Sequence, residues 1–325
     1  MLLIIIVTAI AWNQYQKFMN TPLSIDEQGY VYTVLSGSNL QQISHDLVDA
    51  DLSLLPSEYL RIYGRLTHKA HLIKAGEYRI KANTTLPQLL DLLIAGKVIQ
   101  YSFTIVEGMT AQQLINMVAM DERFSKTLTD TSLTAVMKVL KLPLNHGEGE
   151  FSPETYHFTS GSTDVQILRR AHRLMTANLE GAWKNKAKNL PYKTPYEALI
   201  MASIIEKETG IAEERPQIAG VFVRRLEIGM RLQTDPTVIY GLGAQFDGNL
   251  HRKDLRADTP YNTYTRYGLP PTPIALPSKE SIEAALHPQR GKSLYFVATG
   301  QDGKHIFSTN LADHNKAVRQ YQLKK

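Results

Sequence analysis

One stretch organises the second half of the chain: Pro195-Tyr196-Glu197-Ala198-Leu199-Ile200-Met201-Ala202-Ser203-Ile204-Ile205-Glu206-Lys207-Glu208-Thr209. Pro195 is typical of a first helical position, and Gly210 is typical of a residue that ends a helix. No residue from Ala198 to Ile205 carries a charge, so the predicted helix is apolar on all sides. A helix of this kind is buried nearly all round, and we therefore place it in the core of the larger domain.

Glu206 is the first charged residue after this apolar run. On a helix, its neighbours three and four positions earlier are Ser203 and Ala202, whose small side chains leave space beside its carboxyl group. Burial favours the protonated carboxyl group that a general acid needs near neutral pH, so Glu206 is the first candidate for this role. Glu208 is a weaker candidate. Alternatively, either glutamate forms an ion pair at a helix end with Lys207, Arg224 or Arg225.

Three loops after this helix are rich in amide, hydroxyl and aromatic side chains, interspersed with Pro and Gly. They are Leu232-Gln233-Thr234-Asp235-Pro236-Thr237-Val238-Ile239-Tyr240-Gly241, Tyr261-Asn262-Thr263-Tyr264-Thr265 and Gly268-Leu269-Pro270-Pro271-Thr272-Pro273. Such groups suit sugars, which offer hydroxyl groups for hydrogen bonds and C–H faces for stacking. The alternative is ordinary turn chemistry, because the same residue types form turns.

The other segments predict further helices and strands, and hence a mixed chain. We expect strands at 30–35 and 76–80 and a hairpin at 294–308, around Gly300-Gln301-Asp302-Gly303. We expect helices from Leu40 to Leu47, at 56–66, 86–94, 110–140, 164–188 and 215–228, and from Ala312 onward. Loops are expected at 143–161 and 230–275. Residues 32–43 and 103–114 both have the pattern of a strand, a glycine turn and a helix with a polar cap. The two segments are either an internal repeat or two unrelated β-turn-α units, which share this pattern in any protein.

The first twelve residues, Met1–Trp12, are almost purely apolar, and polar residues then end the run. The run is shorter than the roughly 20 residues that span a bilayer, and no basic residue precedes it. Three interpretations stay open: a single-pass anchor whose start lies upstream of Met1, a signal peptide cleaved near Ala9-Ile10-Ala11, and a buried N-terminal helix. The first two place the rest of the chain outside the cytoplasm, and we predict the first.

Composition excludes several classes of protein. The 325 residues are 43% hydrophobic and contain no Cys, which removes disulfide scaffolds and cysteine nucleophiles. The net charge of +5 is too small for a nucleic-acid tail, and we predict no nucleic-acid partner. The sequence has no HExxH, SxxK or GxSxG motif, and Gly291-Lys292-Ser293 lacks the first glycine of a P-loop. We therefore predict neither a metal nor a cofactor.

Several blocks together resemble the endolytic murein transglycosylase (YceG-like) family. They are Ala202–Thr209, Arg231–Gly241, Tyr261–Tyr264, Gly268–Pro271 and the C-terminal Asn310-Leu311-Ala312-Asp313-His314-Asn315. Their order and spacing match that family over roughly residues 25–325, and the block at 232–241 is the most specific. The resemblance extends over nearly the whole chain apart from its apolar start.

The resemblance implies an α+β protein with four parts. These are a membrane anchor at 1–19, a linker at 20–29, a LysM-like α/β subdomain at 30–100 and an α+β catalytic domain at 101–325. The catalytic glutamate of the family falls on Glu206, in agreement with the burial argument. For contacts with substrate we select Gln233, Asp235, Tyr240, Asn262, Tyr264 and Glu154.

Two features depart from the family. The loop before the long basic helix usually reads Pro-Asp-Thr, whereas this chain has Pro153-Glu154-Thr155. The longer carboxylate leaves the placement of Glu154 open. The apolar N-terminal run is also shorter than in the family and lacks leading lysines.

The implied reaction is cleavage of the β-1,4 bond between N-acetylmuramic acid and N-acetylglucosamine inside a glycan strand, which leaves a 1,6-anhydro end. The implied setting is the bacterial inner membrane, crossed once, with the catalytic domain in the periplasm. The partners are peptidoglycan glycan strands and, by resemblance, peptidoglycan synthases (penicillin-binding proteins), whose growing strands such a cut would terminate. Two alternatives remain: an idle membrane-tethered murein-binding scaffold, and a hydrolase that uses water with Glu154 or Asp235 as base.

Overall fold

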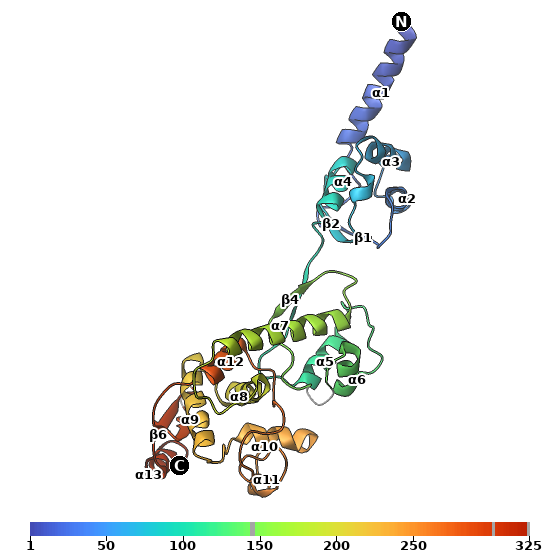
Figure 1. The fold of residues 1–325 in the computed structure, drawn as a ribbon. Helices are drawn as coiled ribbons and strands as arrows, with labels where there is room; N and C mark the ends of the chain where they lie inside the picture. Colours follow the sequence, from blue (N-terminus) through green and yellow to red (C-terminus); the bar gives the residue numbers. More distant parts are fainter. Residues whose placement is uncertain (144–146, 301–302, 324–325) are drawn as a thin grey trace. The chain divides into compact units, whose positions relative to one another are not determined.

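The computed structural model describes residues 1–143, 147–300 and 303–323, and it divides the chain into two compact units. The first unit comprises Met1–Phe103 and His157–Ser162, and the second comprises Thr104–Tyr156 and Thr163 to the C-terminus. In the described residues, the helices combine with three two-stranded sheets, β1–β2, β3–β4 and β5–β6 (Figure 1). The predicted α+β class is therefore confirmed.

The first unit contains a strand–helix–helix–strand sequence followed by a further helix. The elements are α1 (Leu2–Asn20), β1 (Tyr30–Val34), α2 (Leu40–Asp49), α3 (Ser57–Leu66), η1 (Ala70–Leu72), β2 (Gly76–Ile80), α4 (Leu86–Ala95) and most of β3 (Tyr101–Thr104). Strands β1 and β2 are antiparallel, with Tyr30 opposite Ile80. Tyr78, Ile43 and Leu89 are fully buried between this sheet and the helices. The elements predicted from residue 30 to residue 94 are thus present.

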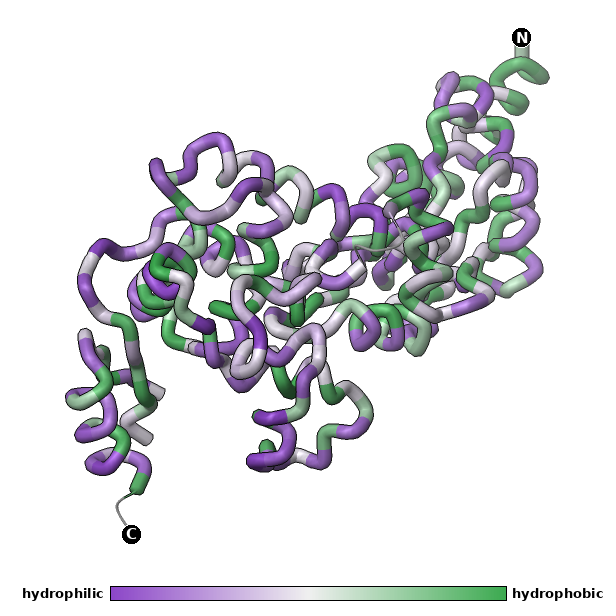
Figure 2. The backbone as a smooth tube through the Cα atoms, turned by 60° about the horizontal axis from the view of Figure 1, so that its bottom comes forward, coloured by the Kyte–Doolittle hydropathy of each residue, from purple (hydrophilic) through white to green (hydrophobic). Residues whose placement is uncertain are grey.

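Helix α1 is exposed along its first half. The first thirteen residues of the chain are all exposed, and only Phe18, near the end of the helix, is buried. The Phe18 ring packs on Tyr63 and Tyr59 of α3, with ring centroids 5.0 and 6.1 Å apart. The interpretation of Met1–Trp12 as a buried helix is therefore wrong, and the hydrophobic colour of this end is visible in Figure 2. Across the described residues, no helix combines the length and the apolar character needed to cross a membrane.

The second unit is mainly helical. Its elements are α5 (Ala111–Met120), α6 (Leu133–Leu140), the start of β4 (Thr155–Phe158), α7 (Asp164–Lys184), α8 (Pro195–Glu208), η2 (Ala212–Glu214), α9 (Arg215–Glu227), α10 (Asp235–Leu242), η3 (Gly243–Gln245), α11 (Arg252–Arg256), α12 (Lys279–Leu286), β5 (Tyr295–Ala298), β6 (His305–Ser308) and α13 (Leu311–Tyr321). Strands β5 and β6 form the predicted hairpin, with Tyr295 opposite Ser308. Gln301 and Asp302 of its predicted turn lie outside the described residues.

Helix α8 forms the centre of the second unit. Every residue from Ala198 to Ile205 is buried, as the absence of charge predicts. Helices α7, α9 and α12 pack around α8, which Figure 1 shows among them. Ser203 ties α8 to the segment before α12, because its Oγ accepts a hydrogen bond from the Ile274 amide at 3.0 Å. The C-terminal end of α8 is consequently held in a fixed place within the unit.

Three expectations about secondary structure are wrong. The single helix expected at 110–140 is two helices, because the buried Asp164 carboxylate accepts hydrogen bonds from the Thr127 and Leu128 amides and holds that segment out of helical geometry. The expected loop at 143–161 contains strand β4, because Thr155–Phe158 pairs with β3. The expected loop at 230–275 contains α10 and α11. Helix α10 begins at Asp235-Pro236, where proline suits the first helical turn instead of marking a loop.

Candidate active site

Glu206 lies in the last turn of α8, with its carboxyl group almost enclosed. Its side chain is 5% exposed. Ser278, the N-cap residue of α12, donates two hydrogen bonds to Glu206 Oε2, from its amide at 2.8 Å and from its Oγ at 2.5 Å. The negative end of the side chain thus meets the start of a helix, where backbone N–H groups favour negative charge. One carboxyl oxygen is fixed by this contact, and the other is left for other partners.

Arg215 faces the second oxygen of Glu206. Its Nη2 lies 3.5 Å from Glu206 Oε1 and 4.0 Å from Oε2 of Glu107. Arg215 is 8% exposed, whereas the Glu107 side chain is 52% exposed. Burial and the nearby Glu206 raise the pKa of the Glu107 carboxyl group, and Arg215 acts in the opposite direction. One buried cation therefore stands between two carboxyl groups.

The loop before α5 lies against the end of α8. Gly108 donates its amide to the Leu276 carbonyl at 2.9 Å, and the Leu276 amide bonds to the Met109 carbonyl at 2.8 Å. Lys207 Nζ donates to the Gly108 carbonyl at 3.1 Å. Gly108 has a φ of +72°, and a Cβ there would lie 3.9 Å from Cγ of Glu206. The loop therefore approaches the Glu206 side chain through a residue without a side chain.

A cleft of about 560 Å³, which we call the Glu107 cleft, opens beside this loop. Glu107 and Glu154 both line it, together with Ser152 and Asn178. Glu154 is exposed, and its carboxylate accepts a hydrogen bond from the Thr155 amide at 2.9 Å. The predicted site residue Glu154 is thus placed in the same cleft as Glu107.

Three further predicted residues gather in a different cleft. Gln233, Asp235 and Tyr264 line a space of about 570 Å³, the Asp235 cleft, together with Glu208 and His305. The Tyr264 hydroxyl donates to Asp235 Oδ1 at 2.6 Å. Burial raises the pKa of Glu208 to about 7, although the Thr234 hydroxyl donates to its carboxyl group. Glu208 therefore projects away from Glu206, as its spacing on the helix predicts.

Tyr240 lies in a third cleft, of about 810 Å³, which we call the Tyr240 cleft. Its hydroxyl donates to Oε2 of Glu148 at 3.1 Å, and Oε1 of that residue accepts the Ala111 amide at 2.8 Å, at the start of α5. Glu148 is 4% exposed, and burial raises its pKa to about 7. Lys207 lines the same cleft.

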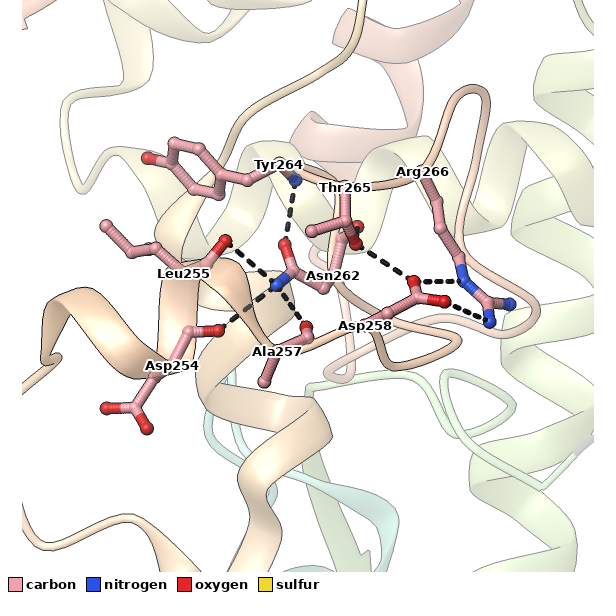
Figure 3. A network of polar contacts seen from close by, with 8 residues as sticks. All are labelled: Asp254, Leu255, Ala257, Asp258, Asn262, Tyr264, Thr265 and Arg266. Atoms are coloured by element: carbon pink, nitrogen blue, oxygen red, sulfur yellow. Dashed lines mark hydrogen bonds and ion pairs between the residues drawn. The ribbon is translucent and has the colours of Figure 1, made fainter.

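Asn262 is fully buried and holds its own loop together (Figure 3). Its amide nitrogen donates to the backbone carbonyls of Asp254, Leu255 and Ala257, at 3.1, 3.2 and 2.7 Å. Its Oδ1 accepts the Tyr264 amide at 2.8 Å. Asn262 thereby fixes the residue that bonds to Asp235, and its polar atoms are engaged within the protein.

The structure thus places five of the seven predicted site residues in three clefts, whereas Asn262 is buried within its own loop and Glu206 lines none of the three. Glu206 lies among residues that sequence reasoning did not select, namely Glu107, Arg215 and Ser278, and Glu148 was also missed. The pair Glu107-Gly108 precedes a capping box formed by Thr110 and Gln113, and this position at a helix start is the signal that was available. In the described part of the chain, no group of three or more His, Asp or Glu side chains is arranged to hold a metal ion.

Comparison with known proteins finds relatives that match most of this chain. The chain is 32% identical to an endolytic murein transglycosylase from Bacillus subtilis (strain 168), over 94% of this chain and 89% of that protein. It is 29% identical to the endolytic murein transglycosylase of Streptococcus pneumoniae serotype 2 (strain D39 / NCTC 7466), of which it spans 61%.

A solved structure is similar as well. A yceG-like protein from Listeria monocytogenes superposes with a TM-score of 0.56 at 30% identity, covering 90% of this chain and 99% of that one. The sequence profile of the YceG-like family matches residues 32–320, which is most of the chain. On this evidence the chain is a member of the YceG-like family.

Proposed function

We propose that this protein is an endolytic murein transglycosylase and that Glu206 is its general acid and base. The observation that carries the proposal is the enclosed Glu206 carboxyl group, with one oxygen fixed by Ser278 and the other facing Arg215. Relatives that share most of the chain are named endolytic murein transglycosylases. A single well-placed carboxyl group suffices for this chemistry, because the nucleophile is a hydroxyl group of the substrate itself.

The proposed reaction proceeds in two proton transfers. Protonated Glu206 gives its proton to the glycosidic oxygen as the bond to C1 of the N-acetylmuramic acid ring breaks, and that ring gains oxocarbenium character. The Glu206 carboxylate then takes the proton of the C6 hydroxyl of the same ring, and that oxygen closes on C1. The products are a 1,6-anhydro end and a free hydroxyl on N-acetylglucosamine, and Glu206 is protonated again. The nucleophile is part of the substrate, which reduces the entropic part of the barrier.

We assign the glycan strand to the clefts around the end of α8. Gln233, Asp235 and Tyr264 would contact the strand in the Asp235 cleft, Tyr240 in the Tyr240 cleft and Glu154 in the Glu107 cleft. Asn262 would act through Tyr264, because its own amide is engaged in the loop. Asp235, already bonded to Tyr264, is the carboxylate we propose for stabilising positive charge on the sugar ring.

The first unit fits a supporting role in the same process. Its β1–α2–α3–β2 order supports the proposal of a LysM-like module that binds the glycan. The exposed apolar residues at the start of α1 support the proposal of a membrane anchor that holds the second unit in the periplasm. Peptidoglycan synthases are then the expected neighbours, since a cut in a growing strand ends its elongation.

The test is a digest of purified peptidoglycan with the full chain, wild type beside Glu206→Gln, with the products read by mass spectrometry. Internal fragments with 1,6-anhydromuramic ends that disappear in the variant are expected. Fragments heavier by one water would instead indicate a hydrolase with Glu154 or Asp235 as base. If both proteins bind glycan without cleaving it, the protein would be a scaffold. This result must also hold when the protein is tethered to a membrane and when nascent strands are the substrate.

A further inference from the structure

Arg215 has more bonding capacity than its surroundings use. Its Nε is buried and has no hydrogen-bond partner among the described residues. Its Nη2 approaches Glu206 at 3.5 Å and Glu107 at 4.0 Å, both longer than the 2.7–2.9 Å of a close charge-assisted bond. A nearly enclosed guanidinium therefore stands between two carboxyl groups and is tightly bonded to neither.

This arrangement bears on the reaction because Glu206 must exist in two charge states. It has to hold a proton before the glycosidic bond breaks, and it has to be a carboxylate afterwards. An exclusive pair with Arg215 would favour the carboxylate and oppose the first step. A second anion that takes up the cation while Glu206 is neutral removes this conflict.

Resting on the proposed function, we propose that Glu107 is a positioning residue that shares Arg215 with Glu206. The cation lies toward Glu107 while Glu206 carries its proton, and toward Glu206 after the proton has left. Glu107 is suited to this exchange because its side chain is about half exposed and stands on a loop, directly before Gly108. Arg215, in contrast, stands on a helix, because it is the first residue of α9.

The other charges around the pair come from three parts of the chain. Lys207, on α8, points to the Gly108 carbonyl. Lys279 and Glu280, in the first turn of α12, and Glu154, before β4, line the Glu107 cleft. Glu280 and Glu154 both raise the pKa of the Glu107 carboxyl group, less than burial and Glu206 do. No ion pair between these outer glutamates and Arg215 is formed in the described structure, so they serve as comparisons.

The test measures kcat/KM for release of anhydro ends against pH, using the full chain and glycan strands. Glu107→Gln should move the basic limb of the profile to lower pH, because Arg215 then has only Glu206 as partner. Arg215→Gln should move the same limb in the opposite direction. In the Arg215→Gln background, the further change Glu107→Gln should shift the limb less than it does in the wild type, because only the direct repulsion between Glu107 and Glu206 is then removed. Glu280→Gln, which removes the same charge from the same cleft, should leave the limb in place.

The outcomes separate this proposal from the proposed function. A folded Glu107→Gln variant with the wild-type limb, or equal shifts of the limb with and without Arg215, would overturn the sharing. Glu107→Asp should restore most of the limb position, which a merely structural role would not require. If Glu206→Gln still releases anhydro ends at the wild-type rate, the proposed function itself fails. Thermal melting of each variant establishes that it is folded.

Discussion

Ser278 donates both its amide and its hydroxyl to the same oxygen of Glu206, at 2.8 and 2.5 Å. The Ser278 hydroxyl also accepts the Ser281 amide at 3.2 Å, so one side chain both caps α12 and holds the reacting carboxyl group. The two tasks can be separated by substitution, because glycine retains most of the capping effect and alanine does not.

Ser278→Gly and Ser278→Ala should both lower kcat about 5- to 30-fold, since each loses one hydrogen bond to a charged group, worth about 1–2 kcal/mol. KM should change little, because the backbone bond still holds the carboxyl group. Only Ser278→Ala should also lose about 1 kcal/mol of unfolding free energy. Steady-state kinetics and urea denaturation of both variants give the comparison. Unchanged kcat in both would show that the hydroxyl does not affect the reaction.

Glu148 should make the protein less stable as pH rises. Burial raises its pKa from 4.5 to about 7, so the folded chain keeps this proton over a range in which the unfolded chain has lost it. The stabilising contribution is therefore complete below about pH 4.5 and is lost as pH rises through about 7. Glu148→Gln, which stays neutral, should flatten this part of the curve, removing on the order of 3 kcal/mol of pH-dependent stability. Urea denaturation at several pH values measures it, and an unaltered slope would contradict the assignment.

Asn262→Asp should destabilise the surrounding loop strongly, although the two side chains have nearly the same size and shape. The substitution retains the acceptor for the Tyr264 amide but turns a carboxylate toward three backbone carbonyls. A loss of about 2–4 kcal/mol is expected, with faster hydrogen exchange at residues 252–266. Arg266→Gln is the matched control, because it breaks only the exposed pair with Asp258 and should leave the melting temperature within error.

Tyr264→Phe and Asp235→Asn should each weaken binding of glycan strands, and the double variant should be little worse than either single one. The reason is that the two side chains are joined by one hydrogen bond of 2.6 Å and face the same cleft. Binding is measured with inactive Glu206→Gln as the parent protein. Tyr267→Phe, at an exposed tyrosine stacked on Arg231, serves as the control. Additive losses would mean that the two residues contact the strand independently.

Much of the fold can be predicted because it is specified locally. The absence of charge from Ala198 to Ile205 predicts a buried helix, and the strand expected at 76–80 lies at the same residues in the structure. The segment at 121–132 could not be predicted, because Asp164 holds it from 37 residues away. Helix α10 was missed because Asp-Pro at a helix start resembles a turn.

In the candidate site, too, local features could be predicted from the sequence and long-range contacts could not. Glu206 could be selected from its helix alone, and its role as the acid stays a prediction. Its partners could not be selected. Ser278 lies 72 residues further along the chain, and Arg215 belongs to another helix, α9, whose position relative to α8 the sequence does not give. Spacing on one helix identifies a carboxyl group with small neighbours, but it carries no information about which distant segment covers it.

The last three residues of α8 each hold a different part of the second unit: Glu206 holds Ser278, Lys207 holds Gly108 and Glu208 holds Thr234. These contacts join positions from 26 to 99 residues apart. A ribosome that has released residue 206 but not residue 278 has therefore made a chain without an assembled site. The glutamate site is therefore assembled only once the chain has been made as far as Ser278 and has folded.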